Sequence, residues 1–249
     1  MKLVIKTDAQ EAASCVADQI ASYLVLKPDL VMGLATGETM RPVYTRLRAR
    51  FDADDVPSSA FTSFNLDEFI GVPTTHPGSF HAYMAGELFS HIEHAGDRCF
   101  LPDGMADDPA TAATDFEMKI AQSGGVDLQL LGIGRNGHIG FNEPGTPFDS
   151  RTAVVELSAQ TRRVMQGFGV ERPGKAITMG IGTIIEARRC LLLATGEAKA
   201  AAVSAMLEQP PSTACPASAL QDHQDLLIVL DRSAASHLTE RSLQTMDRE

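Results

Sequence analysis

The segment from Gly134 to Pro144 has the sequence GRNGHIGFNEP and combines residue types that a simple connecting loop rarely needs. Its histidine, His138, stands among glycines, and Glu143 follows five residues later. Glycine is common where a backbone turns tightly or approaches a ligand closely. An imidazole changes its charge near neutral pH, and a neighbouring carboxylate can orient it. The segment therefore predicts a loop that holds His138 and Glu143 for proton transfer, the alternative being a structural histidine bonded to backbone.

Two adjacent carboxylates, Asp67 and Glu68, follow directly after an expected strand at 61–66. The carboxyl end of a strand in an α/β sheet is a common place for side chains that line a cleft. A carboxylate there could move a proton to or from a carbon beside a carbonyl. A solvated acidic loop, or Asp67 capping the next element, explains the pair about equally well.

A turn made of Thr36, Gly37, Glu38 and Thr39 joins an expected strand to an expected helix. Free N–H groups, hydroxyls and the positive end of the helix dipole at such a turn suit a phosphate. Glu38 would repel a phosphate unless its side chain points away. Lys199, after a second Thr-Gly pair, could add a point charge to the anion. The turn lacks P-loop and dinucleotide spacing, so an ordinary turn and a solvated lysine are the alternatives.

Short apolar runs alternate with helical stretches along the chain. Strands are expected at 3–5, 30–34, 61–66, 126–131, 153–157, 176–179, 190–194 and 226–230. Helices are expected from an Asp8 cap to about 26 and at 41–50, 79–91, 110–122 and 198–207, with loops at 97–109 and 209–216. This alternation predicts an α/β fold with a mainly parallel twisted sheet and helices on both faces. No long linker interrupts it, so residues 1–249 are expected to form a single domain.

The charge balance and the cysteines narrow the class of protein. Lys+Arg 21 against Asp+Glu 32 gives a net charge of −11, which argues against nucleic-acid and anionic-membrane partners. No apolar run approaches the roughly 20 residues of a membrane helix, and the first residues show no signal-peptide pattern. The scattered cysteines form no CxxC pair, which favours a reduced, cytoplasmic setting.

Other groups of reactive side chains give only weak evidence for a functional site. His91 and His94 lie three residues apart with Cys99 nearby, a spacing that can bind zinc, but no further ligands are evident. A polar helix end is the better interpretation, and no metal is expected. There is no GxSxG nucleophile elbow and no cysteine in an activating context. Proton transfer on a phosphorylated small molecule is the chemistry that remains.

Taken together, these segments resemble the glucosamine-6-phosphate deaminase family, also called glucosamine-6-phosphate isomerase. The resemblance covers nearly the whole chain and is carried by LATG at 34–37, FNLDEFIG at 64–71, HPGS at 76–79, LGIGRNGHIGFNEPG at 131–145, AITMGIGTI at 176–184 and PASALQ at 216–221. GHIGFNEP is highly specific, whereas the Thr-Gly turn alone is not. The resemblance implies the Rossmann-like fold that the family shares with 6-phosphogluconolactonases.

The resemblance also implies a reaction, in which an amino-hexose 6-phosphate and water give a ketohexose 6-phosphate and ammonia, with no metal or organic cofactor. Asp67 resembles the base that moves a proton between C2 and C1. His138 resembles the acid/base for ring opening, assisted by Glu143, and Asn136 stands where some members have Asp and others Asn. The residues that match the family's phosphate cradle are Thr36, Gly37, Thr39 and Lys199.

The sequence departs from the family pattern in three places. Glu38 stands where members often have Gly or Ser. No arginine aligns in Gln166-Gly167-Phe168, where many glucosamine-type members carry one that helps hold the phosphate. Residues 145–148 do not resemble the allosteric site of hexameric members. A monomer or small homo-oligomer is therefore expected rather than an allosteric hexamer.

Glucosamine 6-phosphate, giving fructose 6-phosphate, is the expected substrate, and the first two departures keep galactosamine 6-phosphate, giving tagatose 6-phosphate, as the alternative. A 6-phosphogluconolactonase shares the fold and a Gly-rich histidine loop but lacks the Phe-Asn-Glu-Pro found at 141–144. A non-catalytic sugar-phosphate sensor would need a DNA-binding segment, whereas this acidic chain starts a strand by Leu3.

Overall fold

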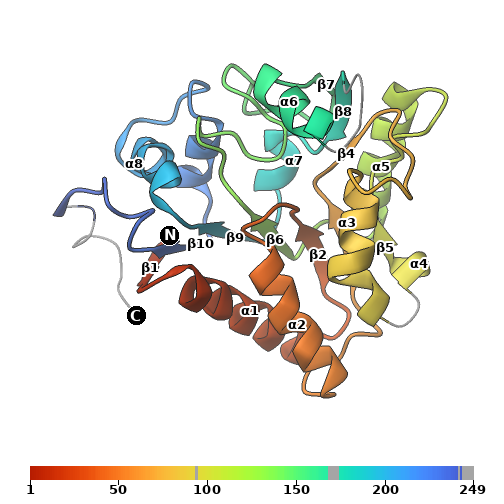
Figure 1. Ribbon diagram of the computed structural model, residues 1–249, viewed down its shortest axis with the longest axis horizontal. Coiled ribbons are helices and arrows are strands. Elements are labelled where there is room, and N and C mark those ends of the chain that lie inside the picture. The colour runs from red at the N-terminus through yellow and green to blue at the C-terminus, as the bar shows by residue number, and fades with distance from the viewer. Residues whose placement is uncertain (93–94, 168–173, 241, 243–249) are drawn as a thin grey trace.

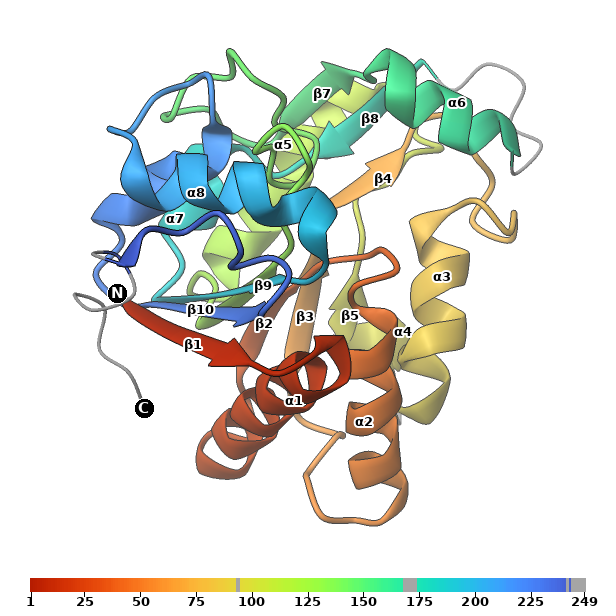
Figure 2. The same cartoon turned by 60° about the vertical axis from the view of Figure 1, so that its left-hand side comes forward.

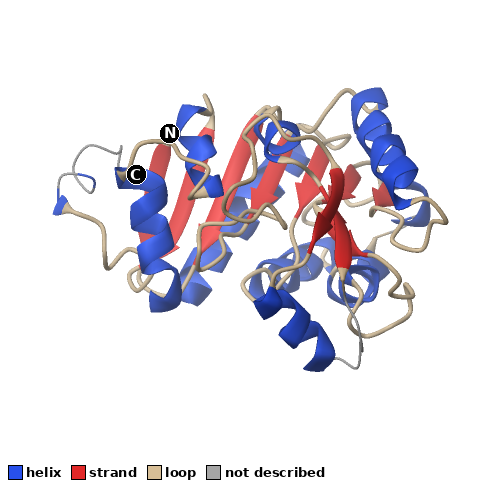
Figure 3. Ribbon diagram, turned by 90° about the horizontal axis from the view of Figure 1, so that it is seen from above, coloured by secondary structure: helices blue, strands red, loops and turns tan. Residues whose placement is uncertain are grey.

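The computed structural model describes residues 1–92, 95–167, 174–240 and 242 of the chain. Within these residues, seven strands form one parallel sheet, which runs across the molecule in Figure 3. From one edge to the other, the strands are β1 (Lys2–Lys6), β10 (Leu226–Asp231), β9 (Arg189–Ala194), β6 (Leu128–Leu131), β2 (Val31–Leu34), β3 (Thr62–Asn65) and β5 (Cys99–Phe100). The prediction of a mainly parallel α/β sheet is confirmed.

Helices lie on both faces of this sheet, with α1 and α2 on one face and α5 and α8 on the other (Figures 1 and 2). The α-helices are α1 (Ala9–Leu26), α2 (Arg41–Asp52), α3 (Phe80–Glu87), α4 (Ala95–Arg98), α5 (Pro109–Gln122), α6 (Ala159–Gly167), α7 (Ile181–Ile185) and α8 (Ala200–Glu208). Shorter 3-10 turns are η1 (Phe89–His91), η2 (Glu197–Lys199) and η3 (Pro216–Asp222). None of the helices in the described part of the chain has the length and apolarity needed to cross a membrane.

The chain order of the strands explains both the helix layers and the position of a cleft. From β1 through β2 and β3 to β5 the chain advances toward one edge, and from β6 through β9 to β10 it advances toward the other. Because parallel crossovers are right-handed, the two series place their helices on opposite faces. The series diverge between the neighbouring strands β2 and β6. Ligands bind at such a switch point, beyond the carboxyl ends of the strands.

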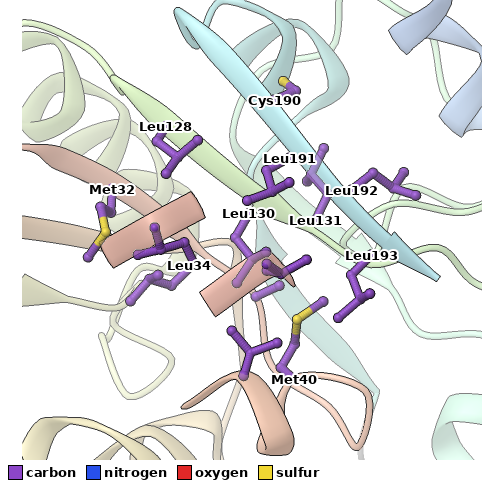
Figure 4. Packing of buried hydrophobic residues seen from close by; sticks show 14 of the residues in the cluster. Met32, Leu34, Met40, Leu128, Leu130, Leu131, Cys190, Leu191, Leu192 and Leu193 are labelled. Atoms are coloured by element: carbon purple, nitrogen blue, oxygen red, sulfur yellow. The ribbon is translucent and has the colours of Figure 1, made fainter. Parts of the chain in front are cut away.

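The centre of the sheet is packed with aliphatic side chains from β2, β6 and β9 (Figure 4). Leu34, Leu131 and Leu192 are each fully buried, and Met40, just before α2, packs into the same cluster. Burying a leucine side chain stabilises a fold by about 1.5–3 kcal/mol. The strand ends that carry the cleft loops are therefore held by well-packed core.

The residues that begin α1 illustrate how local sequence sets an element. The Asp8 carboxylate accepts hydrogen bonds from the N–H groups of Gln10 and Glu11, both at 2.9 Å. These are donors that the first turn of a helix leaves unpaired. The predicted cap and the predicted end of the helix at 26 are both confirmed.

A second, smaller sheet corrects the sequence prediction. It contains β4 (Asp67–Phe69), β8 (Lys175–Thr178) and β7 (Ala153–Glu156), all paired antiparallel. The strands expected at 153–157 and 176–179 exist, but they lie outside the parallel sheet. Residues 67–69 were expected in a loop, and that was wrong. Three residues, two of them acidic, carry no strand signal, and the long-range pairing of Asp67 with Thr178 forms the strand.

Five further elements are absent from the prediction, namely α4, β5, α6, α7 and η3. The expected loop at 97–109 contains β5, a two-residue strand in which Cys99 and Phe100 pair with Ser63 and Phe64. Such a short strand is defined by its partner and has no alternating pattern of its own. The expected loop at 209–216 ends where η3 begins.

Candidate active site

A cavity of about 520 Å³ opens at the switch point, beyond the carboxyl ends of β2, β6 and β9. Six of the eight predicted site residues line it, namely Asp67, His138, Thr36, Gly37, Thr39 and Lys199. The other two, Asn136 and Glu143, line an adjoining cavity of about 320 Å³, which also contacts His138. The structure thus brings together all eight residues from four separate segments of the chain.

The two adjacent carboxylates on β4 have different surroundings, because successive side chains of a strand point to opposite faces. Glu68 accepts hydrogen bonds from the backbone N–H groups of Phe69 at 2.8 Å, Phe80 at 3.0 Å and His81 at 2.8 Å. Two of these donors belong to the first turn of α3, so Glu68 anchors that helix to β4. Asp67 instead lines the cavity.

The Asp67 carboxyl is 5% exposed, and among the described residues it has no hydrogen-bond partner. Burial, together with the negative charge of Glu68, raises the pKa of Asp67 from 3.8 to about 8. Gly140, with φ +56°, lies against it: a Cβ there would sit 3.5 Å from Asp67 Oδ2 and 2.9 Å from Thr178 Oγ1. Glycine at 140 therefore lets the histidine loop approach β4 and β8 closely.

His138, Asn136 and Glu143 form a hydrogen-bonded chain. The Asn136 side-chain N–H donates to Glu143 Oε2 at 2.7 Å, and Asn136 Oδ1 lies 2.7 Å from His138 Nδ1. The Glu143 carboxylate has only acceptor oxygens, so it fixes which end of the Asn136 amide faces the histidine. His138 Nδ1 must then carry a hydrogen, which leaves Nε2 as the free basic nitrogen of the neutral ring.

Burial lowers the pKa of the half-buried His138, the Glu143 carboxylate opposes this effect, and Lys199 adds to it. The net direction is below 6.5, which favours the neutral imidazole at physiological pH. A neutral imidazole with a free Nε2 can accept a proton from a sugar hydroxyl and return it to another oxygen. The predicted pairing of His138 with Glu143 is thus present, with Asn136 inserted between them.

The loop that carries His138 is held by close backbone approach and by a buried amide. A Cβ on Gly134 would lie 2.2 Å from the His138 ring, so the imidazole rests directly on the Gly134 backbone. Asn142, 2% exposed, donates to the carbonyl oxygens of Ile139 and Met179, both at 2.8 Å. Sequence reasoning missed this role of Asn142, because only the fold shows which carbonyls surround it.

The turn after β2 presents Thr36, Gly37 and Thr39 to the cavity, just before the start of α2. Glu38, between them, also lines both cavities, but its side chain is 86% exposed and accepts a hydrogen bond from Arg41 Nε at 3.0 Å. The negative charge that would oppose an anion at this turn is therefore solvated and paired with Arg41. Backbone amides, two hydroxyls and the start of a helix remain to face the cavity.

Lys199 ends η2 and directly precedes α8, close to the predicted first helical turn. Its Nζ donates to the Ile133 carbonyl oxygen at 2.6 Å, which holds the ammonium in the cavity wall. Burial lowers the pKa of Lys199, and the positive charge of Arg135 lowers it further. An anion placed between these groups would favour the charged form. The alternative of a solvated surface lysine does not describe this half-buried side chain.

Sequence reasoning missed three residues that line the larger cavity: Arg135, Phe80 and Phe141. Phe80 and Phe141 stack with ring centroids 5.9 Å apart and form an apolar wall shared by both cavities. Arg135 stands inside the most informative segment of the sequence, between Gly134 and Asn136. Its position within this segment could have identified it as a candidate site residue.

The weak zinc constellation gains no support from the described residues. His91 Nδ1 lies 3.0 Å from Asp52 Oδ1, while Glu93 and His94 are outside the described residues. No cluster of three or more potential ligands occurs in the part of the chain that the structure describes.

Of the segment that lacks an aligned arginine, Gln166 is an exposed residue of α6, and Phe168 falls outside the described residues.

Residues 6–229 match the family described as glucosamine-6-phosphate isomerases/6-phosphogluconolactonase. The chain belongs to this family. Curated members that are similar over nearly their whole length are named glucosamine-6-phosphate deaminase. The relative from Shewanella loihica is 47% identical over 97% of this chain and 91% of its own length. The relative from Rhodopirellula baltica is 44% identical over 97% of this chain and 98% of its own length. The relative from Bacillus velezensis is 45% identical over 91% of this chain and 94% of its own length.

Solved structures of the glucosamine-6-phosphate isomerase/6-phosphogluconolactonase family show the same fold. A monomeric glucosamine-6-phosphate deaminase is 42% identical, covers 96% of this chain with 100% of its own, and superposes with a TM-score of 0.91. The 6-phosphogluconolactonase from Trypanosoma brucei covers 96% of this chain with a TM-score of 0.77 at 21% identity, which shows the shared fold alone. The resemblance inferred from the motifs is confirmed, as is the expectation of an enzyme.

Proposed function

We propose that this enzyme converts glucosamine 6-phosphate and water to fructose 6-phosphate and ammonia. The observation that carries the proposal is one cavity lined by a buried, unpaired Asp67, by a histidine with a free Nε2, and by a turn of amides and hydroxyls. Relatives of 43–47% identity named glucosamine-6-phosphate deaminase support the same reaction. The Phe-Asn-Glu-Pro at 141–144, which the lactonase pattern lacks, favours the deaminase over the lactonase.

Ring opening is the step assigned to His138. Its Nε2 takes the proton of the sugar's O1 hydroxyl and delivers it to the ring oxygen as the bond between C1 and that oxygen breaks. Asn136 and Glu143 position the imidazole and stabilise its protonated form. A neutral histidine held in one tautomer is suited to this exchange, because it must both accept and release a proton near neutral pH.

Isomerisation is the step assigned to Asp67. Its carboxylate removes the proton from C2 of the open-chain sugar and returns it to C1, while one proton of the C2 ammonium group passes to O1. The resulting C2 iminium is hydrolysed by water to the ketone and ammonium. A pKa of about 8 makes Asp67 a stronger base than an ordinary carboxylate. Since only the ionised form can accept the C2 proton, kcat/KM is expected to rise with pH up to about 8.

Phosphate binding is assigned to Thr36, Gly37, Thr39 and Lys199, at the wall of the cavity formed by the turns after β2 and β9. Binding the phosphate there orients the sugar carbons toward Asp67 and His138. Residues 1–249 are proposed to work as one catalytic domain in the cytoplasm, without metal or organic cofactor. The monomeric state of the structurally similar deaminase supports a monomer or small homo-oligomer.

A side-by-side assay of the purified protein tests the proposal. Ammonia release is measured with glucosamine 6-phosphate and with galactosamine 6-phosphate, and acid release with 6-phosphogluconolactone. We expect kcat/KM to be highest for glucosamine 6-phosphate. Faster turnover of the galactosamine ester would change the assigned epimer. Lactone hydrolysis in excess of ammonia release would replace the reaction, and binding of the esters without turnover would make the protein a sensor.

A further inference from the structure

The cationic side chains around the two cavities differ in how they are already paired. Arg41, which lines the smaller cavity, contacts the carboxylates of both Glu38 and Glu87. Its charge is largely balanced within the protein. Lys199 bonds a carbonyl oxygen and has no carboxylate partner among the described residues. Arg135, which also lines the larger cavity, has neither a hydrogen bond nor an ion pair with any described residue.

Arg135 is an exposed residue that lines the cavity beside a lysine and has no carboxylate partner among the described residues. The chain carries 32 acidic residues, so carboxylate partners are plentiful. Even so, Arg135 and Lys199 line the same cavity and are close enough for Arg135 to influence the Lys199 ammonium electrostatically. Two neighbouring cations repel each other unless an anion lies between them. Thr36 and Thr39 line the same cavity, which therefore suits an anion that also accepts hydrogen bonds from hydroxyls and amides.

The charge of a phosphate monoester matches this arrangement. It carries about −1.5 to −2 charges at neutral pH and three strong acceptor oxygens. One ammonium balances only about half of that charge, whereas a guanidinium can bind two phosphate oxygens at once through its fork of N–H groups. We propose that Arg135 is a second phosphate-binding cation, which closes over the 6-phosphate from the histidine loop while Lys199 binds it from the opposite turn. This inference rests on the proposed function, because it takes the phosphate ester as the ligand.

The position of Arg135 in the chain links phosphate binding to the loop that carries His138. It stands one residue from Asn136, which orients His138. When Arg135 binds the phosphate, the loop that holds the acid/base group is tied to the non-reacting end of the same substrate. Arg135 touches no reacting carbon, so its removal weakens binding of the phosphate far more than it slows the chemistry.

The test uses the full chain and inorganic phosphate as the probe, with Arg135→Gln, Arg135→Lys and the control Arg188→Gln. Arg188 pairs with Asp127 at 2.8 Å and directly precedes β9, at the end of the strands opposite the cavity, so its substitution removes the same charge far from the cavity. Calorimetry measures phosphate affinity without turnover. Ammonia release from glucosamine 6-phosphate gives KM and kcat.

We expect Arg135→Gln to weaken phosphate binding and to raise KM about tenfold, with kcat changed less than about threefold. Arg135→Lys should recover part of the affinity, and Arg188→Gln should leave both constants unchanged. Phosphate affinity of Arg135→Gln within twofold of wild type, or an equal loss in Arg188→Gln, would overturn the inference. If wild type binds phosphate through Arg135 but releases no ammonia, the proposed function fails while this inference stands.

Discussion

The two walls of the cavity differ in how deeply their functional residues are buried. One wall, formed by β4 and the loop at 134–144, carries Asp67 and the chain from His138 to Glu143. It is deeply packed, with Asp67 and Asn142 nearly inaccessible to solvent. The other wall, formed by the turns after β2 and β9, presents partly exposed hydroxyls and amides and the Lys199 ammonium.

This difference separates two tasks. Burial shifts pKa values, as it does for Asp67 and His138, and thereby produces groups that exchange protons near neutral pH. A phosphate needs no such shift, only donors and positive charge that remain accessible to it. Changes in the proton-transferring groups of the buried wall are therefore expected to act on kcat, and changes in the exposed groups that face the phosphate, including Arg135 of the histidine loop, on KM.

Apart from replacement of the base Asp67, the largest effect on turnover is expected from His138→Gln in the buried wall. Glutamine keeps a polar group of similar reach but cannot accept and return a proton, so kcat should fall about 100-fold or more with KM changed only a few-fold. Steady-state ammonia release measures both constants. A selective rise of KM would place His138 in binding and break the comparison.

Asp67→Asn should reveal the energetic cost of the buried wall. The Asp67 pKa is about 8 in the folded protein against 3.8 ordinarily, so between these values the folded carboxyl holds a proton that the unfolded chain has lost. Wild-type stability is thus lowered progressively as pH rises through this window. Asparagine does not ionise, so the variant should gain on the order of a few kcal/mol relative to wild type between pH 4 and pH 8.

Urea unfolding of both proteins at about pH 5 and pH 8 measures this gain. Asp18→Asn is a suitable control, because Asp18 is an exposed carboxylate paired with Arg50 on the helical face. A stability difference between Asp67→Asn and wild type that does not grow with pH would show that Asp67 is ionised at neutral pH and that burial does not raise its pKa.

Lys199→Gln should act on the exposed wall. It removes one cation from the phosphate while a polar side chain remains, so KM for glucosamine 6-phosphate should rise about tenfold or more with a smaller change in kcat. Inhibition by inorganic phosphate should weaken in parallel. A large fall in kcat at unchanged KM would move Lys199 to the chemical steps.

Glu38→Gln is expected to have the smallest effect. Its carboxylate is solvent-exposed and paired with Arg41, so its removal should change KM less than about twofold and stability by less than about 1 kcal/mol. A marked fall in KM would show that Glu38 turns toward the phosphate in solution.

Much of the fold was predictable because its signals are local. Apolar runs located the central strands, and the cap at Asp8 set the start of α1. The second sheet was not predictable as such, because β4 exists through its pairing with β8, more than 100 residues away in the sequence. The different roles of Asp67 and Glu68 depend on that strand, since only its alternation separates them.

The candidate site was predictable in part for a similar reason. The loop at 134–144 concentrates its functional groups in a few residues, and all eight predicted residues line the two joined cavities. The pairing of Glu38 with Arg41, which balances its charge beside the turn, was not recognisable from the sequence. That Arg135 and Lys199 line the same cavity could be learned only from the fold, since the two are 64 residues apart in sequence.

The most direct test of the account is the rate of ammonia release from saturating glucosamine 6-phosphate at about pH 8 by wild type and by folded Asp67→Asn. Asparagine keeps the shape of Asp67 but cannot accept the C2 proton. The account predicts that wild type releases ammonia and that the variant, still binding inorganic phosphate, loses this activity about 1,000-fold. Activity of the variant within tenfold of wild type would contradict the assignment of Asp67 as the base.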